Sequence, residues 1–110
     1  MNDCIFCKII NKEIPKEFTF ESDTIVAFPD INPSADIHIL IIPKKHIPGM
    51  QDIAKEHGNL LADIYRVANN LVKQYNLSES LIRVVVNAGK AQHVSHLHFH
   101  LLGGNWKKMV

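Results

Sequence analysis

The sequence predicts an α+β domain in which an antiparallel β-sheet carries one long helix across a face and a short helix near the N-terminus. Short apolar, β-branched segments are separated by turn residues, and one longer segment repeats its apolar residues at helical spacing. The 110 residues, 46% of them hydrophobic, are enough to bury a single core. We therefore expect one domain over residues 1–110.

Seven segments are expected to form regular structure. In chain order they are a short helix over 5–10, strands over 18–22, 24–28 and 37–42, a long helix over 53–75, and strands over 81–86 and 96–102. Ile14-Pro15 interrupts the short helix, and the residues over 21–23 supply the turn between the first two strands. A loop over 29–34 with two prolines separates the second strand from the third.

The central and C-terminal segments have their own patterns. The segment over 37–42 is apolar on both faces, which predicts a central strand. The segment over 53–75 carries an apolar stripe opposite polar residues, as an amphipathic helix does. The β-branched segment over 81–86 and the alternating one over 96–102 are separated by a polar loop, and Gly103-Gly104 is expected to end the last strand.

Charge and cysteine content narrow the functional classes. A net charge of +1, with acids and bases mixed along the chain, predicts neither a nucleic-acid partner nor a membrane partner. The longest apolar stretch is too short to span a bilayer, and the N-terminus does not resemble a secretory leader, so we expect a cytoplasmic protein. In a reducing compartment, Cys4 and Cys7 favour metal or redox use over a disulfide.

The most informative motif is His96-Leu97-His98-Phe99-His100-Leu101-Leu102. Alternate residues of a strand share a face, so the three histidines are expected on one side and the apolar residues between them in the core. Three interpretations remain open: an idle polar face, a zinc site completed from elsewhere, or a centre in which the middle imidazole attacks phosphorus.

Cys4-Ile5-Phe6-Cys7 also leaves three interpretations: half a zinc site, a redox pair, or two small core residues. The lack of a βαβ pattern around it disfavours a redox pair. Two thiolates cannot satisfy tetrahedral zinc, so a zinc site requires two further ligands.

Together with the histidine run, several other segments resemble the nucleotide-binding (Hint) branch of the histidine triad family. The matching segments are Cys4–Ile10, Glu13–Pro15, Ala27–Pro33, His38–Ile47, Asn87 with Gly89, and Leu102–Gly104. The resemblance covers nearly the whole chain in order. It implies the family's fold and a purine nucleoside phosphoramidate hydrolase that cleaves a P–N bond and releases a nucleoside monophosphate such as AMP.

The resemblance also implies roles for the three histidines. His98 resembles the nucleophile that forms a nucleotidyl-histidine intermediate, His100 contacts the phosphate and assists, and the backbone carbonyl of His96 orients His98. No metal is required for this chemistry. The rival interpretation is a non-catalytic nucleotide- or metal-binding module.

Nucleotide contacts are carried over in the same way. Asp30 resembles the ligand of the ribose hydroxyls, with Ile31 and Phe6 closing around the base. Asn87 resembles a phosphate-side contact. The residues alone equally allow an Asx turn at Asp30 and turn chemistry at Asn87.

The chain departs from its relatives before the histidine run and at its C-terminal end. The loop over 90–93 is shorter than theirs, and Ala91 replaces a glycine there. Gln92 is retained, whereas His93 falls where a hydroxyl residue is expected; His93 either donates to the leaving amine or faces solvent. The segment after Gly104 is short, in a region that helps to set substrate preference in relatives.

A structural zinc ion and a homodimer complete the expectations. In relatives that keep both cysteines, two histidines complete the coordination of zinc. The resemblance therefore implies Cys4, Cys7, His46 and His96 as the zinc ligands here. The apolar stripe over 53–75 fits either a partner helix across a two-fold axis or core packing. His38 is expected to pack within its strand and His57 to lie on the surface.

Overall fold

A five-stranded antiparallel sheet with a helix on each face forms the domain in the computed structural model, which describes residues 3–110. The strand order is β1-β2-β3-β5-β4. The elements are α1 (Ile5–Ile10), β1 (Phe20–Glu21), β2 (Ile25–Pro29), β3 (Ala35–Pro43), the 3₁₀ turns η1 (Met50–Asp52) and η2 (Lys55–His57), α2 (Gly58–Gln74), β4 (Ile82–Val85), η3 (Gly89–Ala91) and β5 (Phe99–Trp106). The predicted α+β class is confirmed.

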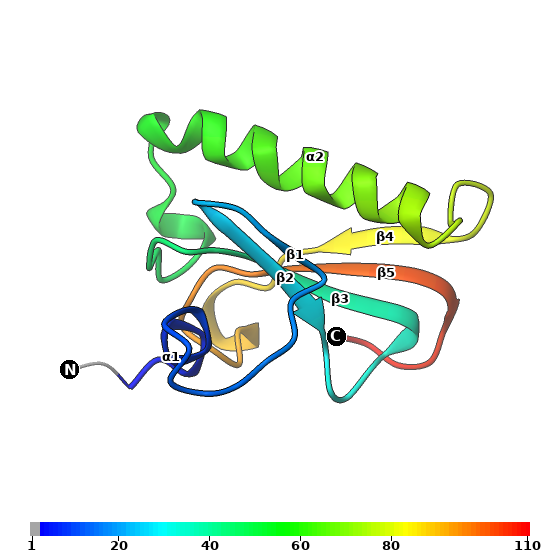
Figure 1. Cartoon of the computed structure of the whole chain (residues 1–110), viewed down its shortest axis with the longest axis horizontal. Coiled ribbons are helices and arrows are strands. Elements are labelled where there is room, and N and C mark those ends of the chain that lie inside the picture. The colour runs from blue at the N-terminus through cyan, green and yellow to red at the C-terminus, as the bar shows by residue number, and fades with distance from the viewer. Residues whose placement is uncertain (1–2) are drawn as a thin grey trace.

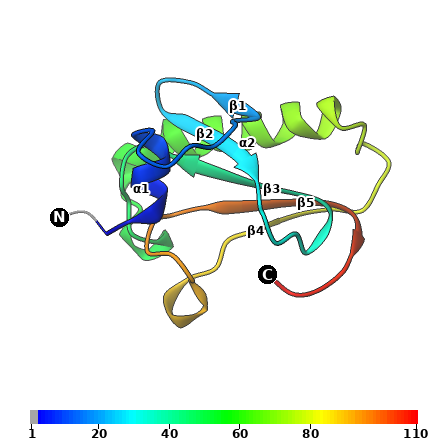
Figure 2. The same cartoon turned by 60° about the horizontal axis from the view of Figure 1, so that its bottom comes forward.

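The two faces of the sheet bury two separate apolar clusters. On one face α2 packs Ile64, Val67 and Leu71 against alternate residues of the central strands. On the other face α1 packs Phe6 and Ile9 against the intervening residues of β2 and β3. The views in Figures 1 and 2 show the two helices on opposite sides of the sheet. The apolar stripe of α2 is thus largely used for packing within the chain.

The long helix begins five residues later than expected. Ile53 and Ala54 have extended backbone, and two short 3₁₀ turns precede Gly58. The Ala54 amide donates to Nδ1 of His57 at 2.9 Å, a local contact that competes with a continuous helix. His57 is buried, so the expectation of a surface histidine is wrong.

The last strand lies further along the chain than expected. Pairing begins at Phe99 and continues to Trp106, and the register shifts between Ala35 and Ile37 of β3. Gly104 has φ +81°, and the amide of Asn105 donates to the carboxylate of Asp36 at 2.9 Å. The glycine pair therefore forms a bulge, and the prediction that it ends the strand is wrong.

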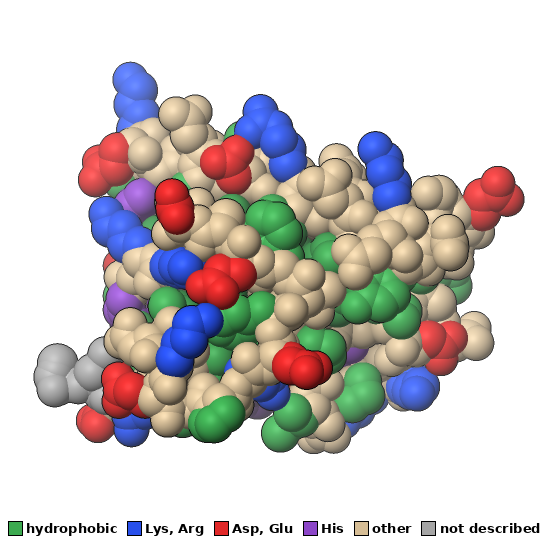
Figure 3. Space-filling view, in the orientation of Figure 1, with side chains coloured by type: hydrophobic (Ala, Val, Ile, Leu, Met, Phe, Trp, Pro, Cys, Tyr) green, Lys and Arg blue, Asp and Glu red, His purple; other side chains and the backbone are tan. Residues whose placement is uncertain are grey.

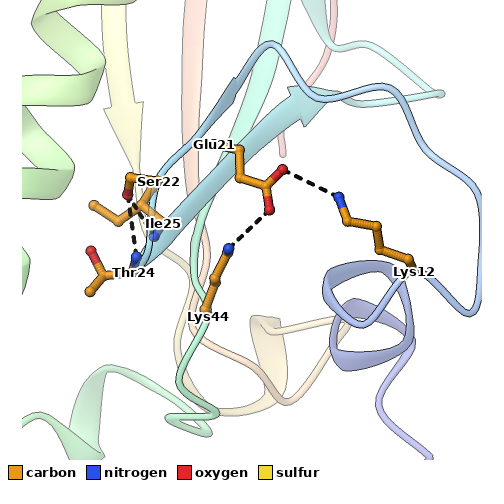
Figure 4. A network of polar contacts seen from close by, with 6 residues as sticks. All are labelled: Lys12, Glu21, Ser22, Thr24, Ile25 and Lys44. Atoms are coloured by element: carbon orange, nitrogen blue, oxygen red, sulfur yellow. Dashed lines mark hydrogen bonds and ion pairs between the residues drawn. The ribbon is translucent and has the colours of Figure 1, made fainter.

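Strand β1 is short, and its end is held by polar contacts (Figure 4). Glu21 accepts hydrogen bonds from Lys12 at 3.2 Å and Lys44 at 2.9 Å. These lysines, Lys44 first, lower the pKa of the Glu21 carboxyl. The hydroxyl of Ser22 accepts from the amides of Thr24 and Ile25, which closes the predicted turn.

Acidic and basic side chains are interspersed over the face in Figure 3. Within residues 3–110, the helices are too short or too polar to cross a bilayer.

Candidate active site

The histidine run crosses from a loop into β5. His96 and His98 precede the paired part of the strand, and His100 lies within it. The intervening Leu97, Phe99 and Leu101 enter the α2-side core, whereas the three histidines are 0%, 6% and 7% exposed. The predicted alternation is therefore confirmed even where ladder pairing has not yet begun.

The backbone fixes the protonated nitrogen of His98. Its Nδ1 lies 2.7 Å from the carbonyl oxygen of His96. A carbonyl only accepts, so we assign the proton to Nδ1, which leaves a lone pair on Nε2. Burial lowers the pKa of His98, against the opposing effect of this hydrogen bond. The ring is therefore neutral and nucleophilic at neutral pH.

A second series of hydrogen bonds, through Ser34 and His38, gives His100 the opposite tautomer to His98. The Ser34 amide donates to Nδ1 of His38 at 2.9 Å, so the proton of His38 lies on Nε2. That Nε2 lies 2.9 Å from Nδ1 of His100 and donates to it, which places the proton of His100 on its own Nε2. His100 therefore presents an N–H donor, and its ring centroid lies 5.1 Å from that of His98.

Burial also keeps the imidazole rings of His38 and His100 neutral. Desolvation, with smaller effects of His98 and His38, lowers the pKa of His100 to about 4. Burial lowers the pKa of His38 as well. The sequence prediction assigned His38 only a packing role, although its position in β3 makes it a diagonal neighbour of His100.

A cavity of ≈ 260 Å³ opens beside His98 and His100. It is lined by Ile5, Phe6, Ile9, Lys16, Phe28, Pro29, Asp30, Ile31, Leu40, His93, Val94, His98 and His100. The ring of Phe6 stands edge-on to His98 with centroids 5.1 Å apart. Ile31 is 85% exposed. A mostly apolar hollow ending in imidazoles suits a flat organic ring joined to a polar group.

Asp30 uses its two oxygens differently. Oδ1 accepts from the Asn32 amide at 2.9 Å, which is the Asx turn considered from sequence. Oδ2 lies 3.5 Å from Nε2 of His38, and the side chain is 23% exposed. The turn holds the carboxylate on the cavity wall, where it can accept further hydrogen bonds.

The loop before the histidine run supplies only part of the predicted set. His93 is exposed and lies on the cavity wall. Gln92 instead donates to the Pro48 carbonyl at 2.8 Å and is not among the described wall residues. Asn87, half-buried after β4, is also outside the described wall.

A group of possible metal ligands that includes His96 lies beside His98 and His100. Ligand atoms of Cys4, Cys7, His46 and His96 all lie within 4.8 Å of one another. Nδ1 of His96 is 3.3 Å from Sγ of Cys4 and 3.5 Å from Sγ of Cys7. Nδ1 of His46 is 3.2 Å from Sγ of Cys7.

The protonation of His96 suits a metal ligand. Its Nε2 lies 2.8 Å from the carbonyl oxygen of Pro43 and must donate to it, so the lone pair of Nδ1 faces the two sulfurs. A histidine whose far nitrogen is held by a carbonyl is typical of metal sites. Two sulfurs and two nitrogens are also a donor set that zinc prefers.

Comparisons with known proteins agree with this geometry. A family model described as "Scavenger mRNA decapping enzyme C-term binding" matches residues 3–109. A purine nucleoside phosphoramidase of Escherichia coli is 40% identical over 104 residues, covering 93% of this chain and 87% of that protein. A 14 kDa zinc-binding protein of Zea mays is 44% identical over 109 residues, covering 93% and 84%.

Solved structures show the same similarity. A HIT family hydrolase from Legionella pneumophila superimposes with a TM-score of 0.91 and is 46% identical, over 94% of each chain.

Proposed function

Because the chain belongs to the histidine triad family, we propose that it is a purine nucleoside phosphoramidate hydrolase that acts through a covalent intermediate on His98. The observation that carries this proposal is that two neighbouring imidazoles have opposite tautomers. His98 offers a lone pair on Nε2, and His100 offers a proton on Nε2. A nucleophile and a donor side by side are what attack on a phosphoryl group requires.

The reaction is proposed to proceed in two displacements. Nε2 of His98 attacks phosphorus, the P–N bond breaks, and the leaving nitrogen takes its electron pair and a proton. The exposed His93, at the mouth of the cavity, is placed to donate that proton. Nε2–H of His100 donates to a phosphoryl oxygen throughout. Water then attacks phosphorus and gives a proton to His93, the P–His98 bond breaks with its electron pair returning to Nε2, and the nucleoside monophosphate leaves.

The cavity is proposed to bind the nucleoside. Phe6 and Ile31 contact the base, and Asp30 accepts hydrogen bonds from the ribose hydroxyls. Gln92 and Asn87, which we expected to bind the nucleotide, lie outside the described cavity wall, so Gln92 is better understood as support for the loop before His93.

Turnover of an adenosine phosphoramidate tests the proposal. The wild-type protein is expected to release AMP, and His98→Ala is expected to abolish turnover. His98→Ala would still bind AMP if the ring serves only in chemistry. A protein that binds AMP but hydrolyses no phosphoramidate would instead support the rival binding module.

We also propose a structural zinc ion held by Cys4, Cys7, His46 and His96. Zinc would join α1 to the turn after β3 and to the start of the histidine run; it takes part in no step of the reaction. Elemental analysis of protein purified without added metal should give one zinc per chain. Cys4→Ser should lower the melting temperature more than turnover. Metal-free, fully folded protein would contradict this assignment.

The remaining proposals are a single-domain, cytoplasmic homodimer with neither a nucleic-acid nor a membrane partner. Most of the α2 stripe packs within the chain, so other apolar surface is also proposed to contact the partner. Leu81, Ile82 and Val84 are exposed around the edge strand β4. Light scattering in solution should give twice the mass of one chain.

A further inference from the structure

The nucleoside cavity contains one cation that the proposed function does not use. Most of the cavity wall is apolar, and its polar side chains are those of Lys16, Asp30, His93, His98 and His100. The proposed function assigns the carboxylate to the ribose and the three histidines to the phosphoryl group and the leaving nitrogen. Lys16 is therefore the polar side chain of the described wall that remains for the base.

Lys16 lies at the end of the cavity away from His100. The strand register places His100, Leu40 and Phe28 side by side on β5, β3 and β2. Neighbouring strands are about 4.8 Å apart, so Phe28 lies about 10 Å from His100 across the sheet. The ammonium of Lys16 lies over the Phe28 ring, 5.1 Å from its centroid. The charge is thus held two strands away from the imidazole that contacts the phosphate.

Apart from this ring contact, the Lys16 ammonium is unengaged. Within residues 3–110 it forms neither an ion pair nor a side-chain hydrogen bond, whereas Lys12 and Lys44 are both bound to Glu21. The Lys16 side chain is half-buried. An ammonium has N–H donors and no acceptor, so a ligand atom that contacts it here has to accept a hydrogen bond.

A purine bound with its phosphate beside His98 would present its six-membered ring at this end. The ribose is attached to the five-membered ring, so the substituent on C6 lies far from the phosphorus. That substituent is an acceptor oxygen in guanine and hypoxanthine and a donor amine in adenine. The neighbouring N7 accepts in all three bases, so the group on C6 is what a lysine can distinguish.

We propose that Lys16 makes the cavity selective for 6-oxopurine nucleotides, those of guanine and hypoxanthine, over adenine nucleotides. This inference rests on the proposed function, which supplies the positions of the phosphorus and the ribose. An oxygen on C6 accepts from the ammonium, whereas an amine on C6 turns a donor towards a donor. The surrounding wall residues Ile9, Phe28 and Leu40 are buried and apolar, so their side chains offer the amine no acceptor.

The test compares two substrates in four proteins. The substrates are the 5′-phosphoramidates of inosine and adenosine, which share the ribose, the phosphoryl group and the leaving group and differ at C6 and N1. The proteins are wild type, Lys16→Met, Lys16→Glu and the matched control Lys12→Met. Lys12 also lies over a ring, 4.7 Å from the centroid of Phe18, which stacks on Phe28, but it is outside the described cavity wall.

The measured quantity is the ratio of kcat/KM for the inosine substrate to that for the adenosine substrate. Wild type and Lys12→Met are expected to favour inosine about fivefold, the lower end of what a contact to a base edge contributes, because Lys16 is only half-buried. Lys16→Met should bring the ratio to about one. Lys16→Glu should favour adenosine, because a carboxylate accepts from the amine.

Calorimetric titration with the two monophosphates, IMP and AMP, measures the same selectivity without the chemical step. Wild type and Lys12→Met should bind IMP about fivefold more tightly than AMP, and Lys16→Met should bind the two equally.

Three results would overturn the proposal. One is a wild-type ratio of one in hydrolysis and in binding, another is an unchanged ratio in both Lys16 variants, and the third is an equal shift in Lys12→Met. A wild-type protein that binds IMP more tightly than AMP through Lys16 but hydrolyses neither phosphoramidate would refute the proposed function and support the selectivity. A protein that binds neither nucleotide would overturn both.

Discussion

Two backbone groups decide what the neighbouring imidazoles can do. The His96 carbonyl holds the proton of His98 on Nδ1, and the Ser34 amide acts through His38 to hold that of His100 on Nε2. Either assignment would reverse if its backbone partner changed from acceptor to donor or from donor to acceptor. At the scale of single residues, His38 is therefore a positioning residue for His100.

Replacing His38 tests this positioning role. His38→Leu removes the donor to His100, which frees its ring to take the other tautomer, and should lower kcat by about 10- to 100-fold with little change in KM. His38→Gln keeps an N–H donor on its side-chain amide and should recover part of kcat. Steady-state kinetics on folded variants decide the matter; equal losses of kcat in the two variants would show that His38 serves only in packing.

The Asp30→Asn variant distinguishes the role of Asp30 in its Asx turn from its proposed role in binding the ribose. Asparagine can still accept from the Asn32 amide, so the loop should keep its shape. Loss of the negative acceptor should raise KM for a ribonucleoside substrate about tenfold. The effect should vanish with a 2′,3′-dideoxy substrate, and a KM equal to wild type for the ribonucleoside would rule out a ribose contact.

Residue patterns predicted part of this site by themselves. The alternation at 96–100 correctly places the three histidines opposite the core, because that pattern is local to one segment. The role of His38 depends on the register of β3 against β5, which no local pattern shows. The positions of Gln92 and Asn87 depend on loop conformation, which no local pattern shows; both lie outside the described cavity wall, and their contact with a nucleotide stays a prediction.

At the scale of elements, β5 continues past the two glycines because Gly104 adopts a conformation that suits glycine. An added Cβ at Gly104 would lie 2.7 Å from Oδ2 of Asp36, the atom that accepts from the Asn105 amide. The bulge in turn lets the chain reach Trp106 and the segment that contacts Ser34. Sequence alone suggested a strand end here, because a glycine pair marks turns and bulges alike.

Gly104→Ala should therefore destabilise the fold. The positive φ and the close contact together predict a loss of about 1–3 kcal/mol in the free energy of unfolding. Gly58→Ala is the matched control, since Gly58 has helical φ −58° and open space around its Cβ position, and should gain about 0.5–1 kcal/mol. Urea unfolding measures both; equal stability of the two variants would contradict the bulge interpretation.

At the scale of the whole molecule, segments far apart in sequence meet at both ends of the central strands β3 and β5. Cys4 and His96 are 92 residues apart, and the C-terminal segment contacts Ser34. Periodicity cannot reveal such contacts. Resemblance to a family suggested the ligand set, but it did not reveal how the short C-terminal segment lies against the site.

The buried histidines should make stability depend on pH. Burial lowers the folded-state pKa values of His38, His98 and His100, to about 4 for His100, from an ordinary value of 6.5. The unfolded chain therefore binds protons first as the pH falls, and stability present above pH 6.5 is lost progressively towards pH 4. For His100 alone the loss is of the order of 3 kcal/mol.

Urea unfolding of the wild type and of Cys4→Ser between pH 7 and pH 5 measures this effect, because ordinary carboxylates take up few protons in that range and the variant lacks the complete zinc site. A free energy of unfolding that stays constant over the range would show that these rings are not held neutral by burial.

Intact-protein mass measurement during turnover tests the central claim, that His98 is the nucleophile, most directly. Mixing the wild-type protein with an adenosine phosphoramidate and stopping the reaction under alkaline conditions should trap one added adenylyl group per chain, located by peptide mapping on His98. His98→Ala should carry none. An adduct on another residue, or rapid turnover by His98→Ala, would contradict the account.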